Sequence, residues 1–239
     1  MLKLYRKSKI GFALVCIGIY ILGSSAAEEA DKIIGYGKLL TLAFHLAMTV
    51  FLLAFICRNN LIKEYGLCSS PFKAKEFLFY IPLAFIVSVN LWFGVTINTS
   101  PFETALFVGS MLCVGFLEEI IFRGFLFKAM AEGSAKAAVI VSSITFGTGH
   151  IINLFNGSGA ELLPNLCQIV YATAAGFMFV ILFYKGKSLL PCIITHSLVN
   201  ALSVVSDSSV ITDTQNIITA AVLTVTAGGY ALILNKRLK

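Results

Sequence analysis

The stretch that decides the fold is TALFVGSMLCVGFLEEIIFRGFLF, residues 104–127. Its only charged side chains are Glu118, Glu119 and Arg123, and the remaining positions are apolar or small. A helix needs about 20 mostly apolar residues to cross roughly 30 Å of hydrocarbon. This stretch therefore predicts a membrane-spanning helix that carries charged groups within it.

Runs of similar length recur along the whole chain. Hydrophobic residues make up 58% of the 239 positions and charged residues 13%, whereas soluble domains have about 45–50% and about 25%. We expect an all-α, polytopic membrane bundle of about eight transmembrane helices. No connection is long enough to bury a second core, so residues 1–239 form one predicted integral membrane domain. The expected spans are Ile10–Ala27, Leu39–Cys57, Phe77–Ile97, Thr104–Phe127, Ala137–Phe155, Leu162–Tyr184, Leu189–Val205 and Ile217–Leu234.

The positions of the basic residues predict how these helices are oriented. All 18 Lys and Arg residues except Lys32 and Lys38 fall in five groups at alternate span ends. Because such residues collect on the cytoplasmic side, we expect both termini there. The dispersed charge favours the anionic lipid of a bilayer as its partner, and no nucleic acid. The segment ending in Ser25-Ala26-Ala27 also fits a cleavable signal peptide, but an uncleaved first span fits the charges equally well.

Ionisable side chains inside the spans are the candidates for function, because each is costly at bilayer depth. Adjacent helical positions point about 100° apart, so we expect Glu118 and Glu119 to lie in different environments. Glu119 can pair with Arg123 at i, i+4, which leaves Glu118 as the freer group. The alternative is a structural Glu–Arg pair beside a snorkelling glutamate. Gly115 and Gly124 offer small surfaces where another helix could approach closely.

Two further predicted helices carry polar pairs. Phe146 and His150 share a face of the fifth span, and His196 and Asn200 share a face of the seventh. A carboxylate and an imidazole can activate a water molecule, while an imidazole and an amide can donate hydrogen bonds to an oxyanion. His45 has no comparable companion and is expected to be structural. Asn90, Asn165 and Gln168 are expected to form hydrogen bonds between helices.

Other chemistries compete with this interpretation. Glu118, His150 and His196 could hold zinc with a water as fourth ligand, although no H-E-x-x-H motif is present, and we expect no metal and no cofactor. A serine nucleophile, Ser142 or Ser197, would lack a third group to orient the histidine. Buried acid and histidine side chains also serve proton relays, so a proton-coupled membrane transporter is an alternative. A non-catalytic, peptide-binding immunity protein is another.

The motifs Glu118-Glu119-x-x-x-Arg123, Phe146-x-x-x-His150 and His196-x-x-x-Asn200 together resemble the signature of the CPBP intramembrane proteases, the CAAX protease and bacteriocin-processing group. The resemblance covers residues 104–205, the expected catalytic core. It implies a metal-independent glutamate endopeptidase in which Glu118 and His150 activate water. His196 and Asn200 would form the oxyanion site, and Glu119 would tune the first acid.

The resemblance also implies a peptide or protein substrate, cleaved near the cytoplasmic face of the membrane. The small size and short loops resemble a bacterial member of the group. We therefore expect a multi-pass protein of the bacterial cell membrane that acts in peptide maturation, signalling or bacteriocin self-immunity.

Overall fold

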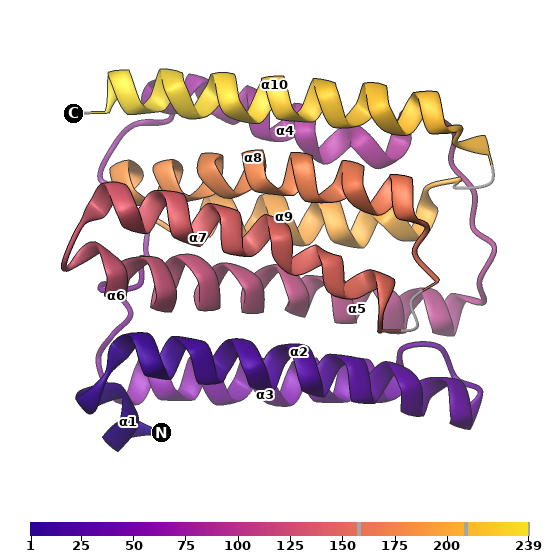
Figure 1. Ribbon diagram of the computed structural model, residues 1–239, viewed down its shortest axis with the longest axis horizontal. Helices are drawn as coiled ribbons and strands as arrows, with labels where there is room; N and C mark the ends of the chain where they lie inside the picture. The colour runs from indigo at the N-terminus through magenta and orange to yellow at the C-terminus, as the bar shows by residue number, and fades with distance from the viewer. Residues whose placement is uncertain (157–158, 208–209, 239) are drawn as a thin grey trace.

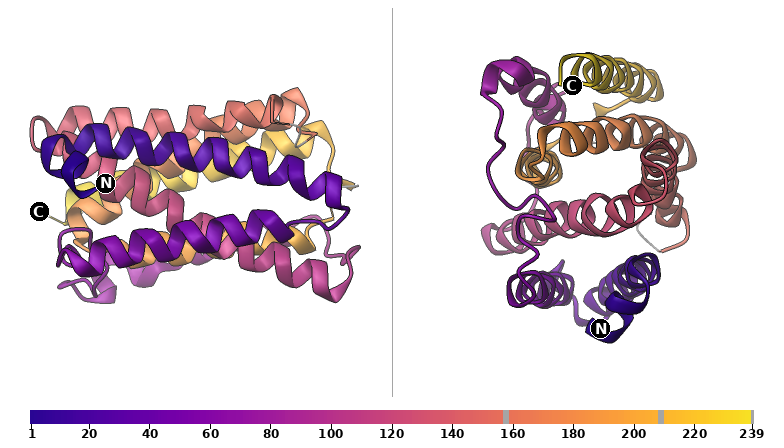
Figure 2. Two further views of the ribbon diagram at one scale, coloured as in Figure 1. Left: turned by 90° about the horizontal axis from the view of Figure 1, so that it is seen from below. Right: turned by 90° about the vertical axis from the view of Figure 1, so that its left-hand side faces the viewer.

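The computed structural model describes residues 1–156, 159–207 and 210–238, and their regular elements are helices joined by short loops. The long helices lie side by side along one direction, and both termini lie at the same end of the bundle (Figures 1 and 2). The elements are α1 (Leu2–Lys7), α2 (Lys9–Ile34), α3 (Leu39–Arg58), η1 (Ala74–Tyr80), α4 (Ile81–Val87), η2 (Ser88–Leu91), α5 (Pro101–Glu118), η3 (Glu119–Phe127), α6 (Lys128–Ala131), α7 (Ala135–Gly149), η4 (His150–Leu154), α8 (Leu162–Gly186), α9 (Leu190–Leu202), η5 (Ser203–Val205) and α10 (Asp213–Arg237).

The predicted membrane architecture is confirmed. Among the described residues, seven helical runs are long and apolar enough to cross a membrane, and Leu190–Val205 is a shorter apolar helix. Large apolar side chains point outward from the bundle, with Leu22, Val225 and Leu232 exposed by 72%, 73% and 66%. Lipid is the solvent that tolerates such a surface. The chain is therefore a multi-pass, all-α membrane protein.

The prediction of a continuous third span over Phe77–Ile97 is wrong, because the helix there is interrupted and ends earlier. The helical run there is Ala74–Leu91, and it is built from short 3₁₀ and α segments. Residues 78–80 have positive φ angles between 51° and 59°, which interrupts the helix. Pro82 contributes to the interruption, because it has no N–H to donate to the carbonyl of Leu78 one turn earlier. Residues 92–97 then form a connection outside the helix.

Small residues let the motif-bearing helices pack closely. A Cβ atom on Gly115 of α5 would collide with Ser197 of α9, lying 2.5 Å from its Cα. A Cβ atom on Gly147 of α7 would lie 2.7 Å from the backbone nitrogen of Thr173 in α8. Such contacts are possible only where side chains are absent. They bring the helices that carry the three motifs to the centre of the bundle.

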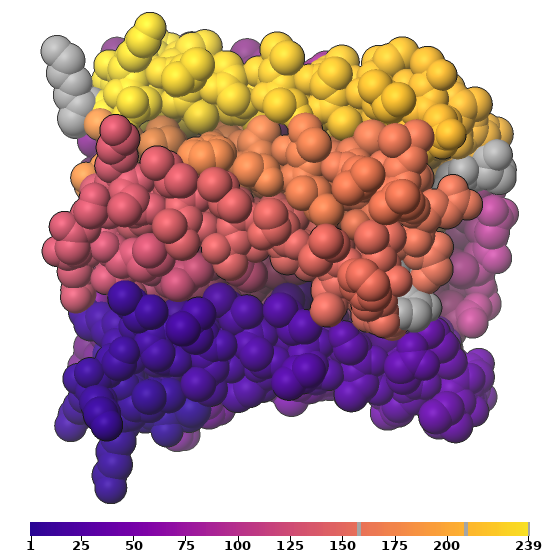
Figure 3. Space-filling view, in the orientation of Figure 1, coloured from indigo at the N-terminus to yellow at the C-terminus, as the bar shows by residue number. Residues whose placement is uncertain are grey.

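The two N-terminal spans flank this centre. α2 packs against α3 and η3, and α3 packs against α5. On the opposite side, α10 covers α8 and contacts α4 (Figure 1). The space-filling view shows α2, α7, α8 and α10 on one face of the molecule (Figure 3). Helices α5 and α9 thus lie between these two sides of the bundle.

Candidate active site

Both glutamates of the first motif lie where α5 changes into η3. η3 is a π-helix, a form that is rare and frequently found at functional sites. The Oε1 atom of Glu119 lies 2.9 Å from His196 Nδ1, and the Oε2 atom of Glu118 lies 3.6 Å from His196 Nε2. One imidazole therefore reaches both carboxylates with its two nitrogen atoms, although the Glu118 side chain is 15% exposed and the Glu119 side chain is fully buried.

The predicted Glu119–Arg123 pair is present and fully buried. The Nη1 atom of Arg123 lies 3.0 Å from Glu119 Oε1, and neither side chain has exposed surface. The guanidinium also lies over the Phe146 ring, with Cζ 3.8 Å from its centroid. A buried cation needs such partners, since it has lost its hydration. Glu119 thus contacts both a permanent cation and His196.

His150 lies at the junction of α7 and η4. Its Nδ1 atom is 3.1 Å from the carbonyl oxygen of Phe146. Because a carbonyl oxygen only accepts hydrogen bonds, Nδ1 carries a hydrogen, and Nε2 is the atom that can hold a lone pair. The side-chain amide of Asn165 on α8 donates to the backbone oxygen of His150 at 3.0 Å, which fixes this turn and confirms the interhelical role expected of Asn165.

Phe146 separates the two motif histidines. Its ring meets His150 edge-on with centroids 5.3 Å apart, and meets His196 edge-on at 5.6 Å. The same ring carries the Arg123 guanidinium. The aromatic residue of the second motif therefore contacts one group from each of the three motifs.

A cavity of about 630 Å³ opens between the helices at this point. The motif side chains on its wall are Glu118, Phe146, His150, His196 and Asn200. Glu119 and Arg123 are not on the wall and lie behind it, without exposed surface. No hydrogen bond joins Glu118 to His150 among the described residues, and the two side chains share the cavity instead. The arrangement can hold a polar reactant between a carboxylate and an imidazole.

This arrangement can be compared with known proteins. Residues 99–202 match the family model described as Type II CAAX prenyl endopeptidase Rce1-like. Residues 99–202 are thus similar to an Rce1-like protease domain, and we refer to them as the Rce1-like domain. All three motifs lie within the matched residues, and the family is one of proteases. No curated protein and no solved structure matches the chain.

One side chain at the site comes from outside the Rce1-like domain, and its role was not predicted from the sequence. The hydroxyl of Tyr20, on α2, donates a hydrogen bond of 2.7 Å to Glu118 Oε1. Tyr20 is itself buried and borders the same cavity. The only sequence signal was a hydroxyl group in the middle of an apolar span, where a buried tyrosine needs a partner.

His45 also lies outside the Rce1-like domain. Its Nε2 atom is 3.0 Å from Ser24 Oγ on α2, and its Nδ1 atom is 2.9 Å from Ser110 Oγ on α5. This imidazole therefore links three helices, as its expected structural role requires. It borders the cavity that holds the motif side chains.

The zinc alternative can be tested against the geometry. In residues 1–156, 159–207 and 210–238, no three His, Cys, Asp or Glu side chains are grouped as ligands for a metal ion. Glu118 and His196 are close together, but His150 does not complete a ligand set with them. The Rce1-like domain thus presents an acid and two imidazoles around a cavity, with one imidazole held by a second acid.

Proposed function

We propose that this protein is an intramembrane endopeptidase of the glutamate type. A water molecule activated by Glu118 and His150 would hydrolyse a peptide bond near the cytoplasmic face of the membrane. The observation that carries the proposal is the convergence of four motif side chains on one cavity inside the bundle: Glu118, His150, His196 and Asn200. The match to a protease family supports the reaction class.

The hydrogen bonds around Glu118 support its role as the base. Tyr20 holds Oε1, so the orientation of the carboxylate is fixed while Oε2 stays directed towards His196 and the cavity. The Nε2 lone pair of His150 provides a second acceptor on the same cavity. A water held between them would lose a proton to this pair, and its oxygen would attack the carbonyl carbon. The proton would then pass to the leaving amine.

The remaining motif residues have a supporting part in this proposal. The amide of Asn200 borders the cavity and would donate a hydrogen bond to the oxyanion of the tetrahedral intermediate. The His196 ring also borders the cavity and would donate from Nε2 in its imidazolium form, because Nδ1 already donates to Glu119. Glu119 orients the His196 ring by its contact with Nδ1, and Arg123 balances the charge of Glu119. Glu119 would therefore act through His196 and would not touch the substrate.

The substrate class follows from the place of the cavity. Because it lies between membrane-spanning helices, the substrate would be a peptide or protein segment at the membrane. We propose a bacterial cell membrane as the location, with peptide maturation, signalling or self-immunity against a bacteriocin as the process.

The test uses the full-length protein in nanodiscs and measures cleavage of a membrane-associated peptide library by mass spectrometry. Glu118→Gln and His150→Ala should each lower kcat by about 10²-fold or more, since each removes a group that transfers the proton. Glu103→Gln is the matched control. It makes the same chemical change on α5, where Glu103 caps the helix away from the cavity, and it should keep wild-type turnover.

Equal turnover in wild type, Glu118→Gln and His150→Ala would overturn the proposal. A chelator should leave turnover unchanged, whereas loss with a chelator and recovery with zinc would favour the metal mechanism. Peptide binding without any cleavage by the wild type would instead favour a non-catalytic binding protein.

A further inference from the structure

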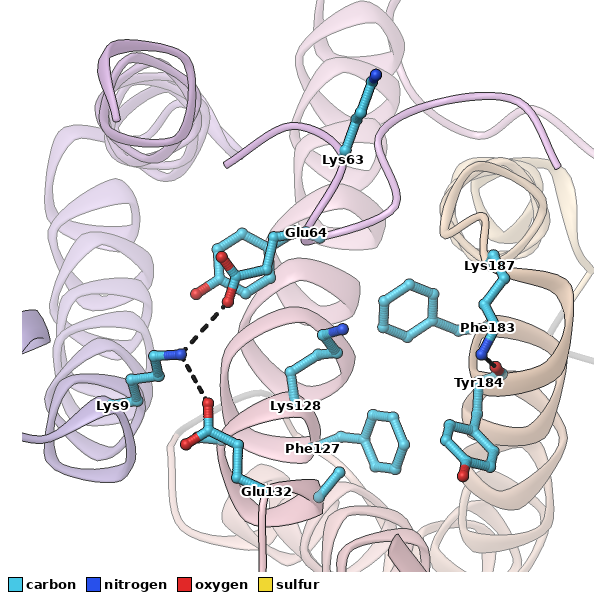
Figure 4. A pocket seen from close by; sticks show the side chains of 12 residues that line it. Lys9, Lys63, Glu64, Phe127, Lys128, Glu132, Phe183, Tyr184 and Lys187 are labelled. Carbon is cyan, nitrogen blue, oxygen red and sulfur yellow. Dashed lines mark hydrogen bonds and ion pairs between the residues drawn. The ribbon is translucent and has the colours of Figure 1, made fainter. Parts of the chain in front are cut away.

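A second hollow, of about 300 Å³, lies at the end of the bundle that carries the two termini. It is formed where α2 and α6 begin, where α8 ends, and by the connection that follows α3 (Figure 4). All of these are helix ends, which places the hollow at the level of the membrane surface. It shares no lining residue with the cavity of the proposed active site.

Four lysines and two glutamates line this hollow. Lys9 contacts both acids, with its Nζ atom 2.6 Å from Glu132 and 3.4 Å from Glu64. The two carboxylates are thus directed at one lysine on one side of the hollow (Figure 4). In the described part of the chain, the other three lysines form no ion pair with a carboxylate. These are Lys63, Lys128 and Lys187.

The three lysines come from separate segments, so the fold and not a local run of charge places them around one hollow. Figure 4 shows Lys128 and Lys187 on either side of the Phe183 ring, whereas the Lys63 side chain is directed away from them. Lys63 lies in the connection after α3, Lys128 at the start of α6, and Lys187 caps α8. Burial and the neighbouring charges of Lys128 and Lys185 lower the pKa of Lys187 below its ordinary value. Positive charge is therefore concentrated here beyond what the protein neutralises, and an anion would relieve the repulsion.

Aromatic rings form the deeper wall of the hollow. Phe127 and Phe183 are buried there, and Tyr184 lies beside them, while the Lys187 Nζ atom donates to the Tyr184 carbonyl at 2.8 Å. Figure 4 shows the Lys128 side chain directed towards the space between α6 and α8, next to the Phe183 ring. The hollow thus offers cationic groups above an apolar surface.

We propose that this hollow binds a phosphate-bearing anion, with Lys128 and Lys187 as its ligands. The headgroup of an anionic membrane lipid and a soluble phosphate compound share this chemistry. A lipid would also place the upper part of its glycerol and acyl groups against the aromatic wall. The site is separate from the proposed active site and does not depend on peptidase activity.

The experiment measures binding to the full-length protein in a zwitterionic detergent by native mass spectrometry. Its probes are short-chain phosphatidylglycerol, short-chain phosphatidylcholine and inorganic phosphate. The double variant Lys128→Gln/Lys187→Gln should bind phosphatidylglycerol about tenfold more weakly or worse, because both cationic ligands are lost. Lys75→Gln/Lys236→Gln is the matched control. It removes two exposed charges from outside the hollow and should bind within about twofold of wild type.

The probes and a second variant separate the outcomes. Lys128→Arg/Lys187→Arg keeps both charges and should retain binding, which distinguishes loss of ligands from loss of folding. Selective binding of phosphatidylglycerol supports a lipid source, and competition by inorganic phosphate at similar concentration supports a soluble source. Equal weakening in both glutamine double variants, or equal binding of phosphatidylcholine, would overturn the proposal.

Discussion

Tyr20 joins the first membrane span to the acid that we propose as the base. Its hydroxyl donates to Glu118 Oε1, and α2 lies outside the residues that match the protease family. The carboxylate could otherwise rotate, because its other oxygen has only the 3.6 Å contact with His196. Tyr20 is therefore a positioning residue in the proposed mechanism.

Tyr20→Phe should lower kcat about tenfold or more and leave KM nearly unchanged, because a hydrogen bond to a charged group is lost while the shape of the cavity is kept. Tyr230→Phe is the control, since Tyr230 is also buried and its hydroxyl donates a 2.7 Å hydrogen bond to the Phe77 carbonyl, outside the cavity. Both variants should show similar thermal unfolding in detergent. Equal kcat in the two would contradict a positioning role for Tyr20.

For single residues, the sequence was sufficient to predict which charged side chains lie inside the membrane spans. Ionisable side chains inside a span are costly, so Glu118, Glu119 and Arg123 could be predicted as functional candidates. The Glu119–Arg123 pair was predictable from its i, i+4 spacing. The contact of His196 with both acids could not be predicted, since it depends on how α9 lies against α5. Tyr20 gave no motif, because tyrosine is an ordinary residue in apolar helices.

Among the elements, the contact between α5 and α9 sets the site. Gly115 packs directly against Ser197, the neighbour of His196. The closeness of these two backbones lets the imidazole reach the glutamates, which lie about one turn further along α5 and η3. Gly124, which was also expected to allow a close approach, meets chiefly the end of the Ile120 side chain.

Gly115→Ala should therefore reduce both activity and stability, the latter by about 1–3 kcal/mol, because the added methyl group collides with backbone atoms of α9. Gly124→Ala is the matched control. Its new Cβ would lie 3.0 Å from the Ile120 Cδ1 atom, which can move aside. Thermal unfolding in detergent and peptide turnover are the measurements, and a larger effect of Gly124→Ala on either would contradict this account.

Two features of the elements could not be predicted from periodicity. The π-helical segment η3 has the same apolar composition as the α-helix before it, so no residue signals the change. The interruption at residues 78–80 had a signal in Pro82, but an apolar run with one proline can also continue as a kinked span. The hydrophobic pattern predicts where a span lies in the sequence. It does not predict which hydrogen bonds form inside the helix.

For the whole molecule, both termini lie at one end of the bundle (Figures 1 and 2). Each terminus carries a group of basic residues, and the other three groups lie in or near connections between the spans. The charge rule predicts that this end faces the cytoplasm. A C-terminal fusion to green fluorescent protein should therefore fluoresce in cells, because that protein folds in the cytoplasm. A C-terminal alkaline phosphatase fusion should be inactive, and high phosphatase activity would contradict the orientation.

The number and order of the spans were predictable, because each span carries its own hydrophobic signal. Their neighbours in space were not, since lipid-facing and protein-facing sides of a span are equally apolar. Thus the placement of α2 beside η3, and with it the contribution of Tyr20 to the site, became visible only in three dimensions.

Because Glu119 and Arg123 are completely buried, their side chains become ordered during folding. Neither side chain has exposed surface, so their positions are set as the chain folds and not as a substrate arrives. The His196 ring is held by the same contact before any encounter. The entropy of ordering these three groups is thus lost once, during folding, and binding energy from a substrate need not be spent on it. The site is preorganised, with little rearrangement left for the reaction itself.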